Sequence, residues 1–432
     1  MRRVNRLHGW GVSLQSRCRC VTTVAVAMSG GIDSAVSALL LKQQGYAVSG
    51  VFMRNWDQSD ESGSGECPLH QDQIDMKDVC KRLGIESIEV SFVKEYWNNV
   101  FSPFVSAYES GMQTPNPDVY CNRHIKFNSF RKHVLDELGF DLMATGHYAR
   151  VEQQEHLTGH PLLLRGLDPS KDQSYFLCCT EGRSLSRVLF PLGNMLKSEV
   201  RKLAAACPLF EGLRVLQKRE SMGVCFIGKR RMDQFLPNYL NPTRGRFIDL
   251  TSGKQVGEHA GAELLTLGQK ARIGGSPEKY FVARKSRSTG NVYVAGGSRH
   301  PSLFCEAVEV LWDEFNWVAG EIPSGLNSSC EGIGSMDCEM QFRHQQTPLP
   351  CTVTLFRSTV DIRDDVSPLS LSSAPTPTNI CRESSSGRMV LRIDSRGEPM
   401  RAPAPGQILA LYSGDICLGG GPIRQAYSTY FN

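Results

Sequence analysis

The chain has 432 residues, of which 41% are hydrophobic, so it is long enough for two or three domains that each bury a core. Its formal charge of +4 does not by itself indicate a nucleic-acid-binding protein, and any basic surface must be local. Fifteen cysteines, none in a C-x-x-C pair, argue against a disulfide scaffold and a structural zinc site. No apolar run approaches the ~20 residues of a membrane span, so no membrane partner is expected.

The first twenty residues are basic. They contain five arginines, and no acidic residue precedes Asp33. Hydroxyl and apolar residues between the arginines are typical of an amphipathic mitochondrial transit peptide, although a basic tail without defined structure is the alternative. We therefore predict a transit peptide at residues 1–20, and its removal would change the charge to 4 − 5 = −1.

A glycine loop follows the first apolar strand pattern. Residues 21–27 predict a strand, residues 35–41 predict a helix, and between them lie Ser29, Gly30, Gly31, Ile32, Asp33 and Ser34. Adjacent glycines allow backbone N–H groups to approach a ligand, and the helix directs its positive dipole end to the same point. This pattern favours a phosphate site without the lysine of a Walker A sequence, in which Asp33 could hold Mg²⁺ or cap the helix. A tight turn with a serine cap is the alternative.

Strand and helix patterns alternate after this loop. The expected elements are strands at residues 46–53, 85–91 and 142–145, and helices at 71–83, 96–109 and 123–138. Such alternation predicts an α/β domain, residues 21–228, with a doubly wound parallel sheet and a ligand beyond the carboxyl ends of its strands.

The second half of the chain is β-like. We expect a small β-rich connecting domain at residues 229–300, with β-like runs at 264–275, 280–284 and 291–295. Residues 301–432 predict a C-terminal β-barrel, with strands at 306–312, 340–343, 351–356, 389–393 and 407–412. Its serine- and proline-rich residues 366–386 are expected to be a disordered insertion.

Two cysteines have distinctive surroundings. Pro115 and Pro117 predict an extended turn that presents Asp118 and Cys121, while Cys225 lies in a glycine-bounded segment. Both thiols are expected in turns where access and a depressed pKa are plausible, and a buried structural thiol is the alternative for each. Residues 223–230 nearly match a Walker A sequence, but no strand precedes them, so we reject that match.

Nine motifs in this order resemble the tRNA-specific 2-thiouridylase family in its mitochondrial form. They are SGGIDS, GVFMRNWD, EYWNNVF, TPNPDVYCNRHIKF, ATGHYAR, KDQSYFL, ESMGVCFIG, LTLGQKARIGG and CLGGGPI. The resemblance covers about residues 21–425 and all three expected domains. It implies a mitochondrial matrix enzyme that uses ATP and Mg²⁺ to thiolate the wobble uridine of the tRNAs for lysine, glutamate and glutamine.

The resemblance also implies roles for individual residues. ATP would be bound by Ala27, Met28, Ser29, Gly30, Gly31, Ile32, Asp33, Ser34, Met53 and Gly146. The target base would contact Asn116, Pro117 and Asp118. Other parts of the tRNA would contact Lys171, Asp172, Gln173, Gln341 and Phe342, although bacterial relatives usually have arginine at the position of Gln341. Cys121 would be the nucleophile, and Cys225 would carry a persulfide delivered by a cysteine desulfurase relay.

The implied chemistry accounts for a nucleotide loop and two cysteines in one enzyme. Uracil C2 carries a poor leaving group until its oxygen is adenylated, and a persulfide then supplies sulfur. A second cysteine can resolve the persulfide, which leaves a Cys121–Cys225 disulfide for a reductant. Asp118 could accept a proton or form an Asx turn, and His147 receives no role. Competing interpretations are another pyrophosphate-loop enzyme, such as an amide-forming or lysidine synthetase, and a non-catalytic RNA-binding protein with a structural nucleotide.

Overall fold

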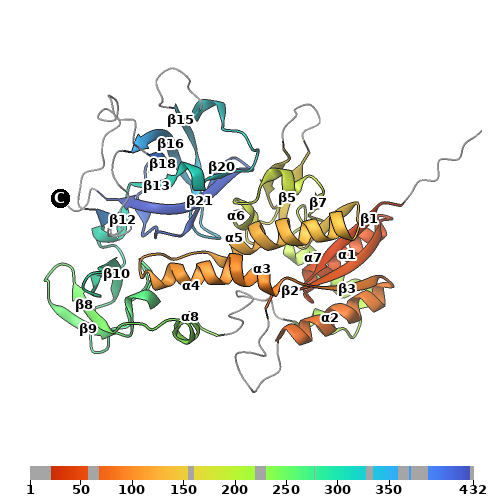
Figure 1. Ribbon diagram of the computed structural model, residues 1–432, viewed down its shortest axis with the longest axis horizontal. Helices are drawn as coiled ribbons and strands as arrows, with labels where there is room; N and C mark the ends of the chain where they lie inside the picture. The colour runs from red at the N-terminus through yellow and green to blue at the C-terminus, as the bar shows by residue number, and fades with distance from the viewer. Residues whose placement is uncertain are drawn as a thin grey trace, which may run out of the picture.

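The computed structural model describes residues 21–56, 68–153, 160–218, 230–276, 278–326, 334–358, 369–370 and 388–428. Figure 1 shows a helix-covered sheet that contains the N-terminal strands, a small sheet around β8 to β10, and a C-terminal body of long strands. The predicted leader, residues 1–20, and the segment that carries Cys225 lie outside the described residues.

The N-terminal sheet is entirely parallel. Its strands are β1 (Thr23–Met28), β2 (Ala47–Arg54), β3 (Glu86–Ser91), β4 (Leu142–Thr145) and β7 (Val188–Leu189). They are ordered β3-β2-β1-β4-β7, so the order in which the chain adds strands reverses between β1 and β4. The predicted doubly wound fold is confirmed, and such a reversal is where open parallel sheets bind ligands.

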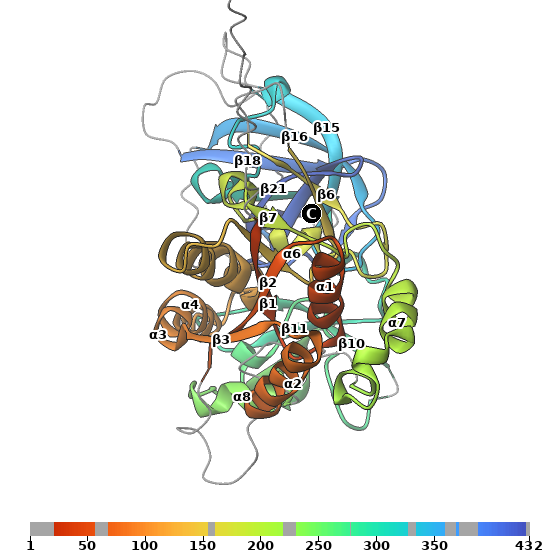
Figure 2. The same ribbon diagram turned by 90° about the vertical axis from the view of Figure 1, so that its right-hand side faces the viewer.

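Helices cover both faces of this sheet. The helices α1 (Ile32–Gln43), α2 (Pro68–Leu83) and α7 (Lys197–Ala206) share a core with alternate residues of β1, among them Val24 and Val26. The intervening Ala25 and Ala27 face a second core that contains Phe101 and Phe127. Figure 2 accordingly shows α3 and α4 on the opposite side of the strands from α1 and α7. The period-2 alternation of β1 therefore contributes to two apolar layers.

The second helical layer consists of two runs that contain wide π-helical turns. One run comprises α3 (Val93–Tyr96), η1 (Trp97–Phe101) and α4 (Ser102–Glu109). The other comprises α5 (Pro117–Tyr120), η2 (Cys121–Phe130) and η3 (His133–Glu137). The second run begins at Pro117 rather than at residue 123 as predicted, because Asn116 caps it and proline suits the first helical position.

A four-stranded sheet forms the connecting region. It contains β8 (Gly245–Asp249), β9 (Gln255–His259), β10 (Tyr280–Lys285) and β11 (Val292–Gly296), in the order β10-β11-β8-β9. The β-like run predicted at residues 264–275 is not a strand, because its backbone hydrogen bonds to β10 amount to an isolated Lys270–Phe281 bridge and a bond from the Gly268 amide to the Val282 carbonyl. Gly268 lies in the left-handed region at φ 74°, which interrupts an extended conformation there.

Six antiparallel strands close into the predicted barrel. They are β13 (Ala307–Leu311), β18 (Arg388–Ser395), β16 (Leu349–Ser358), β15 (Gly334–Gln341), β20 (Ile408–Ser413) and β21 (Ile416–Tyr427), and β21 pairs back with β13. Inside the predicted insertion, Leu369 and Ser370 form β17 and pair with β21, which departs from the expected disorder. The other residues of that insertion lie outside the described part of the chain.

The barrel sheet continues into the N-terminal half of the chain. The hairpin of β5 (Ala149–Glu152) and β6 (Leu162–Arg165) adds to the end of β21 that begins at Ile416. The shorter elements are α6 (Ser174–Leu177), α8 (Met232–Phe235), β12 (Phe304–Cys305), β14 (Asn316–Trp317) and β19 (Met400–Arg401), of which β14 pairs with β21 and β12 with β19. In the described part of the chain, no helix has both the length and the apolarity to cross a membrane.

Candidate active site at the switch point of the parallel sheet

The glycine loop joins β1 to α1 with little room for side chains. Gly30 has a φ of 67°, and a Cβ atom there would lie 2.3 Å from the carbonyl oxygen of Asp72. The Ser34 hydroxyl donates to the Gly31 carbonyl at 3.0 Å and accepts from the Ser29 amide at 3.2 Å. These bonds fix the loop at the start of α1, whose first N–H groups and dipole favour an anion.

Asp33 is held by two residues from distant parts of the chain. Lys197 Nζ lies 2.6 and 2.7 Å from its two carboxylate oxygens, and the Tyr148 hydroxyl donates to Oδ1 at 2.7 Å. Lys197 is buried and its backbone amide donates to Asp168, so the start of α7 is fixed against the loop. Among the described residues no side chain caps α1, so the predicted capping role of Asp33 is not found in this structure.

Lys218 binds the same loop from its other side. Its Nζ donates to the Gly30 carbonyl at 2.8 Å and also lies 2.5 Å from Asp72 Oδ1 and 3.1 Å from Asp75 Oδ2. Neither Lys197 nor Lys218 was anticipated from the sequence, because 164 and 188 residues separate them from their loop partners. The Asp33 carboxylate is the sequence feature that indicates a cationic partner, but it does not specify which lysine binds it.

Gly146 lies beside the loop at the end of β4. A Cβ atom on Gly146 would be 3.0 Å from the Ser34 amide nitrogen, so glycine allows this strand end to approach α1 closely. The next residue, His147, is buried, with Nδ1 at 2.7 Å from Thr145 Oγ1 and Nε2 at 3.4 Å from Lys126 Nζ. Burial, and secondarily the Lys126 charge, holds the pKa of His147 well below its usual value.

Asp118 and Cys121 lie in the first helical turns after Asn116 and not in an extended turn. Asn116 Oδ1 accepts from the amides of Asp118 at 3.1 Å and Val119 at 3.3 Å, so the Asx cap belongs to Asn116. Burial raises the pKa of the Asp118 carboxyl, while the charges of Lys126 and His344 oppose this shift. Cys121 is only 4% exposed, which differs from the accessible thiol that we predicted.

The predicted tRNA-contacting residues of the two halves meet at one interface. Asp172 and Gln341 are both buried, and Arg165 Nη1 lies 3.5 Å from the Asp172 carboxylate and donates to Gln341 Oε1 at 3.2 Å. Gln173 Oε1 accepts from the Tyr148 amide at 3.0 Å, and Phe342 is 2% exposed. These side chains are largely used in internal contacts.

The short helix α6 connects the barrel to the cysteine-bearing helix. The Tyr175 hydroxyl donates to the Ile408 carbonyl at 2.9 Å, which joins this helix to strand β20. The Asn122 side chain donates to the Phe176 carbonyl at 3.0 Å, and the centroid of the His344 ring lies 4.4 Å from that of the Phe176 ring. The barrel therefore supports the start of the helical run that carries Cys121.

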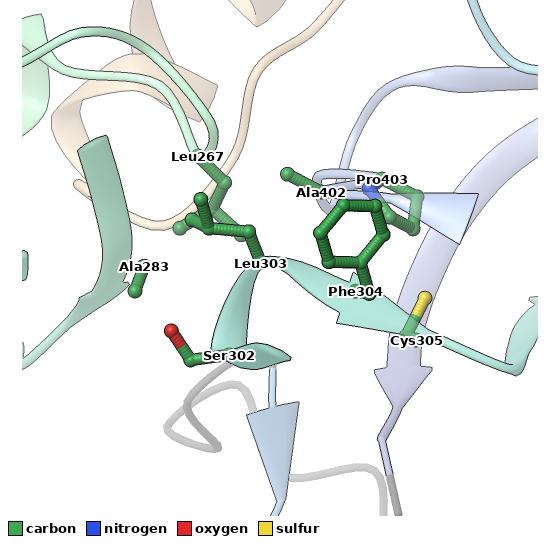
Figure 3. A pocket seen from close by; sticks show the side chains of 8 residues that line it. All are labelled: Leu267, Ala283, Ser302, Leu303, Phe304, Cys305, Ala402 and Pro403. Atoms are coloured by element: carbon green, nitrogen blue, oxygen red, sulfur yellow. The ribbon is translucent and has the colours of Figure 1, made fainter. Parts of the chain in front are cut away.

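Figure 3 shows an apolar cavity away from this region. It is lined by Leu267, Ala283, Ser302, Leu303, Phe304, Cys305, Ala402 and Pro403, and its volume is about 10 Å³. Such a space holds at most one water molecule, and its lining is almost entirely apolar. Among the described residues, no group of three or more histidine, cysteine, aspartate or glutamate side chains could hold a metal ion.

The parallel sheet and its loop define a HUP-type nucleotide-binding protein. The family model described as "tRNA methyl transferase HUP domain" matches residues 22–229, and those described as "tRNA methyl transferase PRC-barrel domain" and "Aminomethyltransferase beta-barrel domain" match residues 233–296 and 381–423. Together with its relatives, these matches show that the chain belongs to the tRNA-specific 2-thiouridylase family.

The alignments with these relatives cover most of the chain. The chain is 41% identical to mitochondrial tRNA-specific 2-thiouridylase 1 of Danio rerio, over 94% of this chain and 92% of the relative. The protein of the same name from Homo sapiens is 40% identical, with 93% and 90% covered. tRNA-specific 2-thiouridylase MnmA of Halalkalibacterium halodurans is 40% identical, with 93% and 94% covered.

Proposed function

We propose that this protein is an ATP-dependent sulfurtransferase that makes 2-thiouridine at the wobble position of mitochondrial tRNAs for lysine, glutamate and glutamine. Relatives that match nearly the whole chain are named for tRNA 2-thiouridine formation. The observation that carries the proposal is the fixed glycine loop at the point where the sheet reverses, next to Gly146. The relatives' names favour a mitochondrial location, and we extend this to the matrix, with residues 1–20 as the transit peptide.

The residues at the loop fit ATP. Backbone N–H groups of Gly30, Gly31 and the first turn of α1, with the Ser29 and Ser34 hydroxyls, would bind the phosphates, while Ala27, Met28, Ile32, Met53 and Gly146 would line the rest of the nucleotide site. Mg²⁺ would neutralise charge on the departing pyrophosphate. Asp33 is the carboxylate within the loop that would serve this ion, and its bonds to Lys197 and Tyr148 fix its orientation.

Sulfur transfer would use both singled-out cysteines. A cysteine desulfurase relay would deliver sulfur to Cys225 as a persulfide, whose outer sulfur attacks C2 while AMP leaves with the C2 oxygen. The Cys121 thiolate would then attack Cys225 Sγ, which breaks the persulfide bond, releases 2-thiouridine and leaves a Cys121–Cys225 disulfide for a reductant. Lys218 precedes Cys225 by seven residues in the sequence and is bonded to the loop, and seven extended residues span at most about 25 Å.

The tRNA would lie across the interface between the parallel-sheet domain and the barrel. We propose that Asn116, Pro117 and Asp118 meet the extruded uridine, with Asp118 as proton acceptor, because its raised pKa suits that task. Lys171 is half-buried and would reach the RNA backbone. Asp172, Gln173, Gln341 and Phe342 would shape this contact surface, since all four already pack or bond within it.

The decisive experiment incubates the full chain with ATP, unmodified tRNA and a persulfide donor, and measures AMP release and 2-thiouridine by mass spectrometry. Cys225→Ser should abolish thiolation while ATP binding persists, whereas Cys207→Ser, at a partly buried cysteine outside the site, should act as the wild type. Unchanged sulfur transfer in Cys225→Ser would contradict the assignment of Cys225 as the persulfide carrier. A non-catalytic RNA-binding protein would release no AMP at all.

A further inference from the structure

We infer that Lys126 is a further catalytic residue, whose ammonium group contacts the phosphate of the adenylated uridine and offsets the charge on AMP as it leaves, and that His147 is its positioning residue. This inference rests on the proposed function. It assigns a task to two residues of motifs that the sulfur chemistry above leaves unused.

The π-helical geometry of η2 places Lys126 on the same face as Cys121. In a π-helix the hydrogen bonds join residues five apart, so Cys121 and Lys126 are neighbours one turn from each other. Asp118 lies in the turn before, close enough for the Lys126 charge to act on the pKa of its carboxyl. The proton acceptor, the thiol and the ammonium group are therefore presented by three successive turns of one helical run.

His147 fixes the direction of the Lys126 side chain. An ammonium group can only donate, so Nε2 of His147 accepts from Lys126 at 3.4 Å and Nδ1 carries the proton donated to Thr145 at 2.7 Å. The ring is also packed against Phe127 and Phe190, with centroid distances of 5.7 and 5.9 Å. A neutral, packed imidazole holds the ammonium group without neutralising its charge.

The same histidine ties Lys126 to the nucleotide. His147 directly follows Gly146, and the close approach of Gly146 to Ser34 puts this turn against the start of α1. Lys126 Nζ, bonded to His147, is thus held next to a turn that contacts the loop that would bind ATP, and its own helical run carries Asp118, which would meet the uridine. The phosphorus of an adenylated base joins the nucleotide to the uridine, so it would lie in this region.

The other two lysines of the site are bound to carboxylates. Lys197 is paired with Asp33, and Lys218 with Asp72 and Asp75. When the persulfide sulfur forms its bond to C2, the C2–O bond breaks and its electron pair leaves with AMP as additional phosphate charge. A fixed cation at that oxygen typically contributes ~10²-fold or more to such a step.

The test compares Lys126→Met and Lys126→Gln with a matched control, Lys132→Met, at an exposed lysine of the same helical run. Single-turnover thiolation, AMP affinity by calorimetry and the melting temperature are measured for each full-length variant. Both Lys126 variants should lose about 100-fold in the thiolation rate and about tenfold in AMP affinity, with melting temperatures near that of Lys132→Met. His147→Gln, which keeps an acceptor, should retain more activity than His147→Leu.

Wild-type AMP affinity in both Lys126 variants would overturn the inference, as would a thiolation rate within about threefold of the control. Because AMP binding is measured without tRNA or sulfur, this outcome is separate from failure of the proposed function, in which the wild-type protein itself would make no 2-thiouridine. The amide of Lys126→Gln can still donate a hydrogen bond to His147. If Lys126→Met does not fold, the glutamine variant alone therefore decides the test.

Discussion

Gly30 is the residue on which the loop geometry depends most directly. Alanine there would have to adopt a left-handed φ of 67° and place its Cβ 2.3 Å from the backbone oxygen of Asp72 in α2. Gly30→Ala should therefore displace the loop and abolish ATP binding, with a loss of stability of more than about 1 kcal/mol. Calorimetric titration with ATP and urea unfolding measure the two effects.

Gly45 offers the control for this prediction. It has a φ of 87°, and in the part of the chain that the structure describes a Cβ atom there would meet no atom beyond its chain neighbours within 4 Å, so Gly45→Ala carries the conformational strain without the collision. We expect a loss of about 1 kcal/mol and unchanged ATP affinity. Equal ATP affinities in both variants would show that the close approach to Asp72 is not what shapes the nucleotide site.

At the residue scale the sequence predicts which residues form the site but not the side chains that bind and orient them. The glycine loop and Gly146 were predicted to share a site, and they lie in contact. The partners of Asp33 were not predicted, since Tyr148 and Lys197 are 115 and 164 residues away and follow no motif spacing. The Lys197 contact depends on the packing of α7 on α1 and the Tyr148 contact on the course of the chain after β4, and local patterns encode neither.

Among the elements, the cysteine-bearing helical run depends on its cap. Asn116→Ala removes the acceptor for two amides and should cost about 1 kcal/mol and reduce thiolation, whereas Asn116→Asp should keep the stability. Asn128→Ala, at an exposed position later in the run, should be close to neutral. Thermal unfolding and the thiolation assay together separate a capping role from a direct contact with the base, because only the latter distinguishes aspartate from asparagine.

Strand β21 shows why one element escaped prediction. Its motif CLGGGPI has the composition of a turn, yet residues 416–427 form a long strand. The glycines serve close packing, because a Cβ on Gly419 would lie 2.0 Å from the Asn316 carbonyl oxygen and one on Gly420 would lie 2.4 Å from Cys178 Sγ. At residues 264–275 the error is the reverse, because a strand was predicted and none is present. The apolar residues of this run pack into a core without forming a continuous strand pairing.

For the whole molecule, histidines that are buried or partly buried make the free energy of unfolding depend on pH. Burial lowers the pKa of His147, His124 and His259 in the folded state below the usual 6.5. In the folded protein these histidines stay neutral, whereas in the unfolded chain they bind protons below pH ~6.5. Their contribution to the free energy of unfolding is therefore present above pH ~6.5 and is lost as the pH falls below it. Each fully shifted histidine adds up to about 1.4 kcal/mol per pH unit to the slope.

Urea unfolding between about pH 7 and pH 5 measures this slope. His147→Gln removes one titrating group and should flatten the dependence. A slope that is identical in His147→Gln and the wild type would contradict the assignment of His147 as a neutral buried group.

The hairpin β5–β6 makes the two largest bodies of the protein inseparable. It belongs by sequence to the nucleotide-binding half, yet β6 completes its hydrogen bonding on β21 of the barrel. An excised fragment that ends before the barrel would therefore expose the edge of β6, and exposed strand edges promote aggregation. Attempts to express the ATP-binding half alone should yield aggregates, and the two halves co-expressed as separate polypeptides should rescue each other's solubility.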